Sequence, residues 1–269
     1  PQPIAKNTPK NIAIYKFIEG EKIIPQDITE KDIDAAISFL RSINLLHLQK
    51  KSDTFPKASD ACFCVQDYID IINRRLNHLL ETPNRTTIEK KLHDFLQREY
   101  LPNLKETVLH IQDMLSKIGY GLDTEIKEKI LSPSDFGFHN ALRTKENALI
   151  FLDFEYFGWD DPAKTISDFL LHPRMKVKTG LKKRFLQEML KNFDFDGKLL
   201  SRLKTIYPLY ALKWCLILLN EFIPSNLLRR NFAAPKKGDE NIILKKQLIK
   251  AVKLLNYAKA IRNNFPYAG

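Results

Sequence analysis

The sequence predicts a mostly α-helical fold of the α+β class, with one strand near the N-terminus and one β-hairpin near the centre. Apolar residues recur at steps of three and four over most of the chain, as in amphipathic helices. Clusters of Pro, Asn and Gly divide these segments. Two short runs rich in β-branched and aromatic residues, within 12–18 and 141–152, predict the strands.

The N-terminal strand is expected to lead into the first helix. Residues 12–18 read Ile-Ala-Ile-Tyr-Lys-Phe-Ile and are followed by Gly20, where the strand should stop. Thr29 is expected to cap the helix, with Asp32 three residues on. The apolar stripe of that helix consists of Ile33, Ala36, Ile37 and Leu40.

Residues 60–118 predict three further helices. A break at residues 82–84, Thr-Pro-Asn, separates the first two, and Pro102 suits the first turn of the third. Gly119 and Gly121 end the third helix, and a short helix is expected near residues 124–131.

A β-hairpin is predicted after this helical region. Its strands are residues 141–143 and 149–152, with a polar turn at residues 145–147. Asn140 and Asp153 are equidistant from a centre between residues 146 and 147. The hairpin should therefore return Asp153 beside Asn140.

Three side chains around this hairpin point to phosphoryl transfer. Asp135 precedes Asn140 by five residues, so its carboxylate should lie near the amide of Asn140 and the carboxylate of Asp153. Oxygen ligands of this kind suit Mg²⁺, which leaves room for phosphate oxygens. The remaining aspartate can accept a proton from an attacking hydroxyl.

The C-terminal half is expected to be helical. Asp161 and Pro162 form a typical helix start, and His172-Pro173 closes that helix. Three more helices are predicted at roughly 179–192, 199–221 and 240–263. Residues 206–222 are the most apolar run, but Pro and Lys interrupt it, so we interpret it as a buried core helix rather than a membrane span.

Composition and charge restrict the class of protein. The three cysteines have no paired metal-type spacing, which favours a reducing, cytoplasmic setting. The net charge is +11, and from Leu170 onward 21 Lys/Arg stand against 6 Asp/Glu. These basic helices could favour an anionic partner, although solvated helix faces are the favoured explanation. No aromatic residues alternate with the charges, so nucleic acid is not expected.

The sequence Asp-x-x-x-x-Asn, followed by a hairpin and Asp-Phe-Glu-Tyr at 153–156, resembles the core of the aminoglycoside phosphotransferase and choline kinase superfamily. The resemblance implies the C-terminal helical lobe of a protein-kinase-like fold, with a catalytic-loop β-hairpin and a remnant hinge strand. It implies Asp135 as the catalytic residue and Asn140 and Asp153 as magnesium ligands. Residues 12–20 are similar to the family's hinge, which implies ATP contacts at Lys16, Phe17 and Ile18.

Three further acidic residues are structural or possible site residues. Asp161 starts a helix, and Asp168 is compared with the family's Asp that braces the catalytic loop, although its spacing from Asp161 is longer than in the family. Glu155 could touch metal or a lysine, or be a surface carboxylate.

The chain departs from the family in two ways. The family's His two residues before the catalytic Asp is replaced by Pro133, and His139 does not occupy its position. Gly20 is the only glycine before Gly119, so the family's Gly-rich phosphate loop is not found ahead of the hinge. We therefore expect residues 1–21 to be a remnant of the N-terminal lobe and hinge, in a fragment of a longer enzyme or, less favoured, a lobe-deleted homologue. Residues 22–269 would be the helical lobe, with a catalytic core at 132–170.

The sequence thus predicts an ATP- and Mg²⁺-dependent small-molecule kinase acting on a hydroxyl of a sugar, polyol or other small metabolite. A choline- or ethanolamine-type acceptor is the close alternative, since Trp159, Tyr207, Tyr210 and Trp214 could surround a cation, although a place in the core is the favoured interpretation of these residues. A catalytically inactive kinase-like binding module is the alternative from another class, because without the phosphate lobe activity should fall by orders of magnitude.

Overall fold

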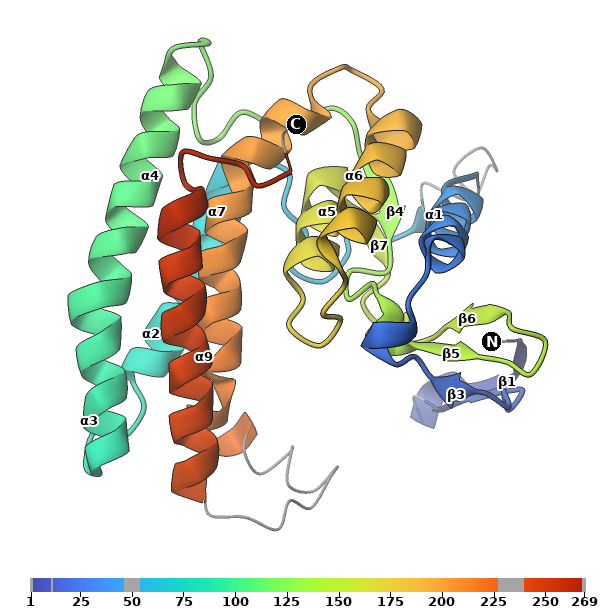
Figure 1. The fold of residues 1–269 in the computed structure, drawn as a ribbon, viewed down its shortest axis with the longest axis horizontal. Coiled ribbons are helices and arrows are strands. Elements are labelled where there is room, and N and C mark those ends of the chain that lie inside the picture. Colours follow the sequence, from blue (N-terminus) through green and yellow to red (C-terminus); the bar gives the residue numbers. More distant parts are fainter. Residues whose placement is uncertain (1, 11, 46–53, 227–239, 268–269) are drawn as a thin grey trace. The chain divides into compact units, whose positions relative to one another are not determined.

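A computed structural model describes residues 2–10, 12–45, 54–226 and 240–267. Their contacts form two compact units (Figure 1). The first comprises Pro1–Ala61 and Glu128–Leu199, and the second comprises Cys62–Lys127 and Leu200–Gly269. The boundary predicted between residues 21 and 22 falls inside the first unit, and the division into lobes stays a prediction.

The first unit begins with an exposed antiparallel hairpin of β1 (Pro3–Asn7) and β2 (Ile12–Tyr15). The predicted strand ends at Tyr15 rather than residue 18. The chain then continues without regular structure to β3 (Glu21–Lys22), which pairs with a later strand. Gly20 permits this pairing, because a Cβ there would lie 2.9 Å from the carbonyl oxygen of Arg143.

The first helix, α1 (Glu30–Asn44), begins at Thr29 as predicted. The backbone amide of Thr29 donates to Asp32 Oδ2 at 2.8 Å, and its hydroxyl donates to the same oxygen at 2.9 Å. The other oxygen of Asp32 lies 3.0 Å from Arg143 Nη2. A local helix-start signal thus also joins α1 to the hairpin of the candidate site.

The helix expected near residues 124–131 is wrong. Ile130–Ser132 instead form strand β4, which pairs antiparallel with β7 (Gly158–Asp160). Residues 56–58 lie along the other edge of β7: Ala58 N donates to Trp159 O at 3.0 Å, and Trp159 N donates to Pro56 O at 2.9 Å. This three-residue strand is defined by partners far away in sequence, which local periodicity does not record.

The predicted central hairpin is present as β5 (Ala141–Arg143) and β6 (Leu149–Phe151), but its register differs by one residue from the expected one. Ala141 pairs with Phe151, so the centre is Glu146 itself. Asn147 has a positive φ of 64°, and its amide donates to Thr144 O at 2.9 Å. A left-handed residue ending a type I turn makes a three-residue loop, and an odd loop centres the hairpin on a residue.

The helix predicted at Asp161-Pro162 is α5 (Pro162–Leu171). Asp161 Oδ1 accepts a hydrogen bond from Ala163 N at 2.9 Å, and the helix ends at His172. It packs on α6 (Thr179–Phe193) and β4, and α1 packs on the same two elements. The core between them contains phenyl rings in stacked, tilted or edge-on contact, those of Phe39, Phe136, Phe138, Phe151, Phe154, Phe169 and Phe185.

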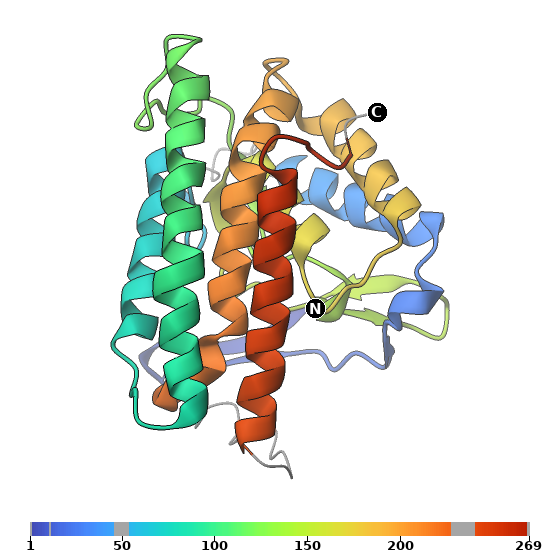
Figure 2. The same cartoon turned by 60° about the vertical axis from the view of Figure 1, so that its left-hand side comes forward.

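The second unit consists of helices that run alongside one another in both Figure 1 and Figure 2. They are α2 (Val65–Leu80), α3 (Thr87–Asp94), α4 (Leu101–Ser116), α7 (Leu199–Leu218) and α9 (Glu240–Ile261). A π-helical turn, Phe95–Tyr100, joins α3 to α4, so the second and third predicted helices are continuous. Its wider hydrogen-bond spacing lets the helix continue to Pro102.

The predicted core helix is confirmed in α7. Residues 205–216 are all buried, and Tyr100 donates a hydrogen bond to Leu212 O at 3.0 Å. Among the described ranges, none of the helices has the length and apolarity that crossing a bilayer would need.

Candidate active site

Asp135 lies in the loop between β4 and a 3-10 turn, Phe138–Asn140. The preceding residue, Ser134, has a positive φ of 68°, a sparsely populated conformation that needs support from its surroundings. That support comes from two hydrogen bonds: Ser134 N donates to Ser132 Oγ at 3.1 Å, and Ser134 Oγ donates to Ser59 O at 3.0 Å. Two hydrogen bonds, one from its backbone and one from its side chain, therefore hold the residue that precedes Asp135.

The two carboxylate oxygens of Asp135 have different neighbours. His139 Nε2 lies 3.0 Å from Oδ1, whereas Asn140 Nδ2 donates to Oδ2 at 3.3 Å and to the Asp135 carbonyl at 3.0 Å. His172 Nε2 lies 3.7 Å from Oδ1. The Asp135 side chain retains 42% of its exposure, so part of the carboxylate is open to a reacting group.

These neighbours set the charge of Asp135. Burial opposes ionisation, but the hydrogen bond and charge of His139, the charge of His172 and the hydrogen bond from Asn140 together outweigh it and hold the pKa of Asp135 below its ordinary value. Burial, followed by the nearby His139, lowers the pKa of His172 to about 3, against the attraction of Asp135. His172 is consequently neutral near pH 7, where the hydrogen bonds from His139 and Asn140 favour the ionised carboxylate.

The hairpin brings Asp153 close to this pair. Leu152 N donates to Asn140 O at 2.8 Å, so Asn140 lies opposite Leu152, and Asp153 follows with a positive φ of 65°. Partial burial, and after it the charges of Glu155 and Asp135, raise the pKa of the exposed Asp153, which is the direction expected for repulsion between Asp153 and these two carboxylates. A divalent cation would relieve this repulsion.

The donor set fits a hard cation. Asn140 turns its amide nitrogen toward Asp135, which leaves the amide oxygen on the other side of the group. That oxygen and the exposed carboxylate of Asp153 are the ligand types that Mg²⁺ prefers, and few protein ligands leave positions for phosphate.

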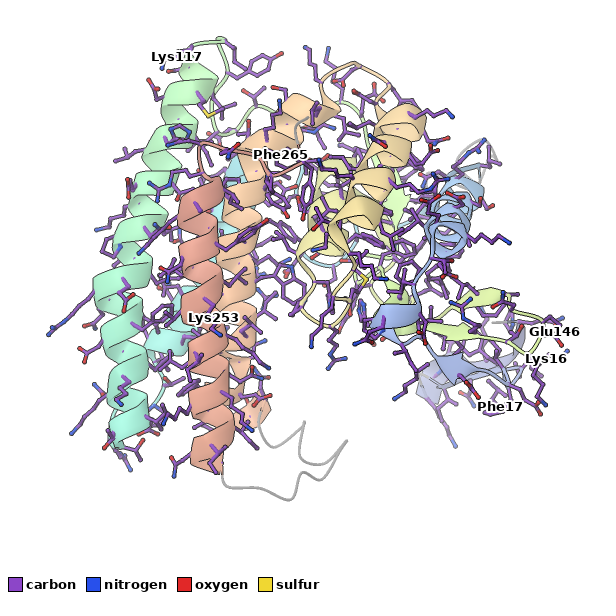
Figure 3. The ribbon with its side chains drawn as sticks, in the orientation of Figure 1. Lys16, Phe17, Lys117, Glu146, Lys253 and Phe265 are labelled. Atoms are coloured by element: carbon purple, nitrogen blue, oxygen red, sulfur yellow. The ribbon has the colours of Figure 1, made fainter. Side chains whose placement is uncertain are left out.

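The segment Lys16–Ile18 lies between β2 and β3, and Phe17 is 85% exposed. β3 pairs with β5 through Glu21–Arg143 and Lys22–Leu142. Lys145 Nζ in the hairpin turn lies 3.3 Å from Glu19 Oε2. Figure 3 places Lys16 and Phe17 at the same end of this unit as Glu146 in the hairpin turn. The expected hinge thus leads into β3 of the small sheet, and the expected metal ligands Asn140 and Asp153 lie just outside its other two strands, β5 and β6.

The remaining acidic residues have structural contacts. Asp161 caps α5, Asp168 Oδ2 lies 3.8 Å from Lys164 Nζ, and Glu155 acts electrostatically on Asp153. Lys164 is buried and was not expected from the sequence. Its Nζ lies 2.6 Å from Asp160 Oδ2 and donates to Ser134 Oγ at 3.3 Å.

Sequence reasoning also missed the role of two histidines. His139 entered only as a histidine that does not occupy the position of the family's His, and His172 only as the end of a helix. The signal available was one histidine inside the Asp-x-x-x-x-Asn motif, but its meeting with His172, which lies 33 residues further along the chain, depends on the packing of α5.

No family model matches the chain, and no curated protein matches it either. Solved structures do. An ethanolamine kinase from Plasmodium vivax matches with a TM-score of 0.55 and 13% identity, covering 96% of this chain and 68% of that one. A choline/ethanolamine kinase family protein from Mesorhizobium loti matches with a TM-score of 0.57 and 14% identity, covering 97% of this chain and 77% of that one. An aminoglycoside phosphotransferase with ADP bound matches with a TM-score of 0.51 and 19% identity, covering 97% of this chain and 76% of that one.

The chain therefore has the protein-kinase-like fold. Within that class its fold is similar to those of choline/ethanolamine kinases and aminoglycoside phosphotransferases, and the predicted fold class and superfamily resemblance are confirmed at the level of fold.

Proposed function

We propose that this chain is an ATP- and Mg²⁺-dependent phosphotransferase that transfers the γ-phosphoryl group to a hydroxyl of a small metabolite. The observation that carries the proposal is the arrangement of Asp135, Asn140 and Asp153 on a kinase-like fold. One carboxylate is held ionised and half open, next to two oxygen donors suited to a cation. One structurally similar phosphotransferase was solved with ADP bound, which supports a nucleotide cofactor.

Each residue has a role in this proposal. Asp135 orients the acceptor hydroxyl and accepts its proton. Asn140 and Asp153 hold Mg²⁺, which would neutralise charge on the β- and γ-phosphates. The backbone at Lys16, Phe17 and Ile18 receives the adenine ring.

The acceptor in this proposal is a sugar, a polyol or another small metabolite, not a polycation. The region from Leu170 onward carries 21 Lys/Arg against 6 Asp/Glu, which repels polycationic acceptors at long range. This excess of Lys/Arg also makes α6 in the first unit and α9 in the second, each by itself, a candidate surface for an anionic partner.

A choline- or ethanolamine-type acceptor is the second candidate, favoured by the kinases of similar fold. The proposed aromatic cage receives less support. Lys213 Nζ lies 4.5 Å above the Tyr210 ring and donates to its hydroxyl at 3.0 Å. Tyr207 packs edge-on against Phe265. Both tyrosines thus have core contacts.

The test is Mg²⁺·ATP turnover by the longest native form of the protein, alone and with sugars, polyols, choline, ethanolamine and an aminoglycoside. We expect Asp135→Ala to lower kcat by roughly 10²- to 10⁴-fold, and Asp153→Ala to weaken Mg²⁺·ATP binding. Asp123→Ala, an exposed aspartate of the second unit, is the matched control.

Two outcomes oppose the proposal. Turnover that neither aspartate substitution changes would remove the site assignment. A native protein that neither binds nor turns over Mg²⁺·ATP would favour an inactive kinase-like binding module.

A further inference from the structure

Two buried imidazoles stack against each other behind Asp135. The ring centroids of His139 and His172 are 3.7 Å apart and the planes differ by 10°. Their side chains are 5% and 6% exposed. Both present Nε2 to the same oxygen, Asp135 Oδ1, at 3.0 and 3.7 Å respectively.

Hydrogen bonding defines which nitrogens of the two imidazoles carry a proton. His172 Nδ1 accepts from the backbone amide of Arg174 at 3.3 Å, so neutral His172 carries its proton on Nε2, toward Asp135. His139 Nε2 faces an ionised carboxylate, which accepts only, so this nitrogen also carries a proton. His139 Nδ1 is buried and has no hydrogen-bond partner among the described residues.

A metal ion held by the same three side chains is the competing interpretation, because their ligand atoms lie within 4.8 Å of one another. The geometry opposes it. Imidazole lone pairs lie in the ring plane, and two nearly parallel rings 3.7 Å apart aim them side by side rather than at one point. The proton on His172 Nε2 would also have to move to Nδ1, which faces an N–H group.

We propose that His139 and His172 are positioning residues that fix the rotation of the Asp135 carboxylate. His139 anchors Oδ1 by its hydrogen bond, and His172 holds the His139 ring in place by stacking. Oδ2, whose one hydrogen bond from the described residues is the 3.3 Å contact from Asn140, is then the oxygen that receives the proton.

The inference rests on the proposed function. In the transfer step the acceptor O–H bond breaks, its proton goes to Oδ2 and its oxygen bonds to the γ-phosphorus, while the bond from that phosphorus to the ADP oxygen breaks. A carboxylate free to rotate would offer either oxygen in many directions. A misplacement of about 1 Å costs on the order of 10²-fold in rate, so the anchor affects kcat more than nucleotide binding.

The kinetic arm compares His139→Ala, His139→Gln and His172→Ala in the longest native form, with Mg²⁺·ATP and water or the best acceptor. We expect His139→Ala to lower kcat by roughly 10- to 100-fold with KM for ATP within about twofold. Gln carries an amide N–H that can reach Oδ1, so His139→Gln should recover much of the loss. His93→Gln, which replaces a buried histidine of the second unit, is the control for general destabilisation.

A second arm needs no activity. Long-range ¹H–¹⁵N spectra report the nitrogens of each imidazole, and Asp135→Asn should shift the ring resonances of His139 and His172 while leaving those of His93 in place. Zn²⁺ titration of the wild type and of His139→Gln tests the metal interpretation in the same samples.

The outcomes separate the two proposals. Absent turnover together with shifted His139 and His172 resonances would reject the proposed function while supporting the anchor. Unchanged resonances, wild-type kcat in His139→Ala, or a Gln variant no better than Ala would reject the anchor. Stoichiometric Zn²⁺ binding that disappears in His139→Gln would replace it with a metal site.

Discussion

Lys164 Nζ lies 2.6 Å from Asp160 Oδ2, with both side chains withdrawn from solvent. The same ammonium donates to Ser134 Oγ, one residue before Asp135. This pair therefore supports the backbone of the candidate catalytic loop from inside the first unit.

Removing one member of the pair should be costly. Lys164→Met leaves the buried Asp160 without its cation, and we expect the free energy of unfolding to fall by about 3–5 kcal/mol in urea denaturation. The double variant Lys164→Met/Asp160→Asn should recover part of this loss, because it no longer buries a lone charge. If the free energy of unfolding of Lys164→Met were within 1 kcal/mol of the wild-type value, the pair would not stabilise the fold in solution.

Acidification should destabilise the fold through His172. The unfolded chain binds a proton near the ordinary pKa of 6.5, whereas burial and the neighbouring His139 keep the folded pKa at about 3. Between these values the unfolded state holds more protons, so stability falls as pH falls. At pH 5 this difference in proton binding lowers the free energy of unfolding by about 1–2 kcal/mol relative to pH 7.

His172→Gln cannot take up this proton. Its stability relative to wild type, measured by urea denaturation, should therefore rise from pH 7 to pH 5. Parallel pH curves for the two proteins would contradict the low pKa of His172, and His93→Gln serves as the variant that replaces a buried imidazole elsewhere.

Cation binding should be sensitive to pH through Asp153. Burial, Glu155 and Asp135 raise the pKa of Asp153 above its ordinary 3.8, so a proton competes with Mg²⁺ at a higher pH than at an isolated aspartate. Mn²⁺ binding in the presence of ATP, followed by electron paramagnetic resonance, should weaken as pH falls. Asp153→Asn should bind more weakly and show a flatter pH dependence, and an Asn variant with the wild-type profile would exclude Asp153 as a ligand.

Gly20 should matter for nucleotide binding. A Cβ there would meet Arg143 O at 2.9 Å and Leu142 Cβ at 3.0 Å, which would push the hinge segment away from β5. We expect Gly20→Ala to weaken ATP binding several-fold by calorimetry. Gly180→Ala, where a Cβ meets nothing within 4 Å, should bind like wild type. Equal affinities for both variants would separate the hinge from the nucleotide site.

The sequence predicted those features whose physical causes are local. Thr29 with Asp32, and Asp161 with Pro162, mark helix starts because the side chains bond to backbone amides within a few residues. The hairpin was readable for the same reason, because a polar turn joins two apolar runs.

The predictions that failed concern features that depend on distant partners in the sequence or on the conformation of single backbone residues. The register slipped by one because the left-handed Asn147 makes an odd loop. Strand β4 is only Ile130–Ser132, and its partner β7 lies beyond the hairpin. The approach of His172 to Asp135 is fixed by where α5 ends, which no local pattern encodes.

Asn44, at the end of α1, accepts from Leu131 N at 2.8 Å through Oδ1 and donates to Leu131 O at 2.9 Å through Nδ2. Its amide thus imitates a neighbouring strand on the edge of β4 that β7 does not cover. Strand β4 is buried, so water does not replace these bonds when the amide is removed. Asn44→Ala would leave the N–H and C=O of Leu131 without these partners and should lower the free energy of unfolding by about 1–3 kcal/mol in urea denaturation.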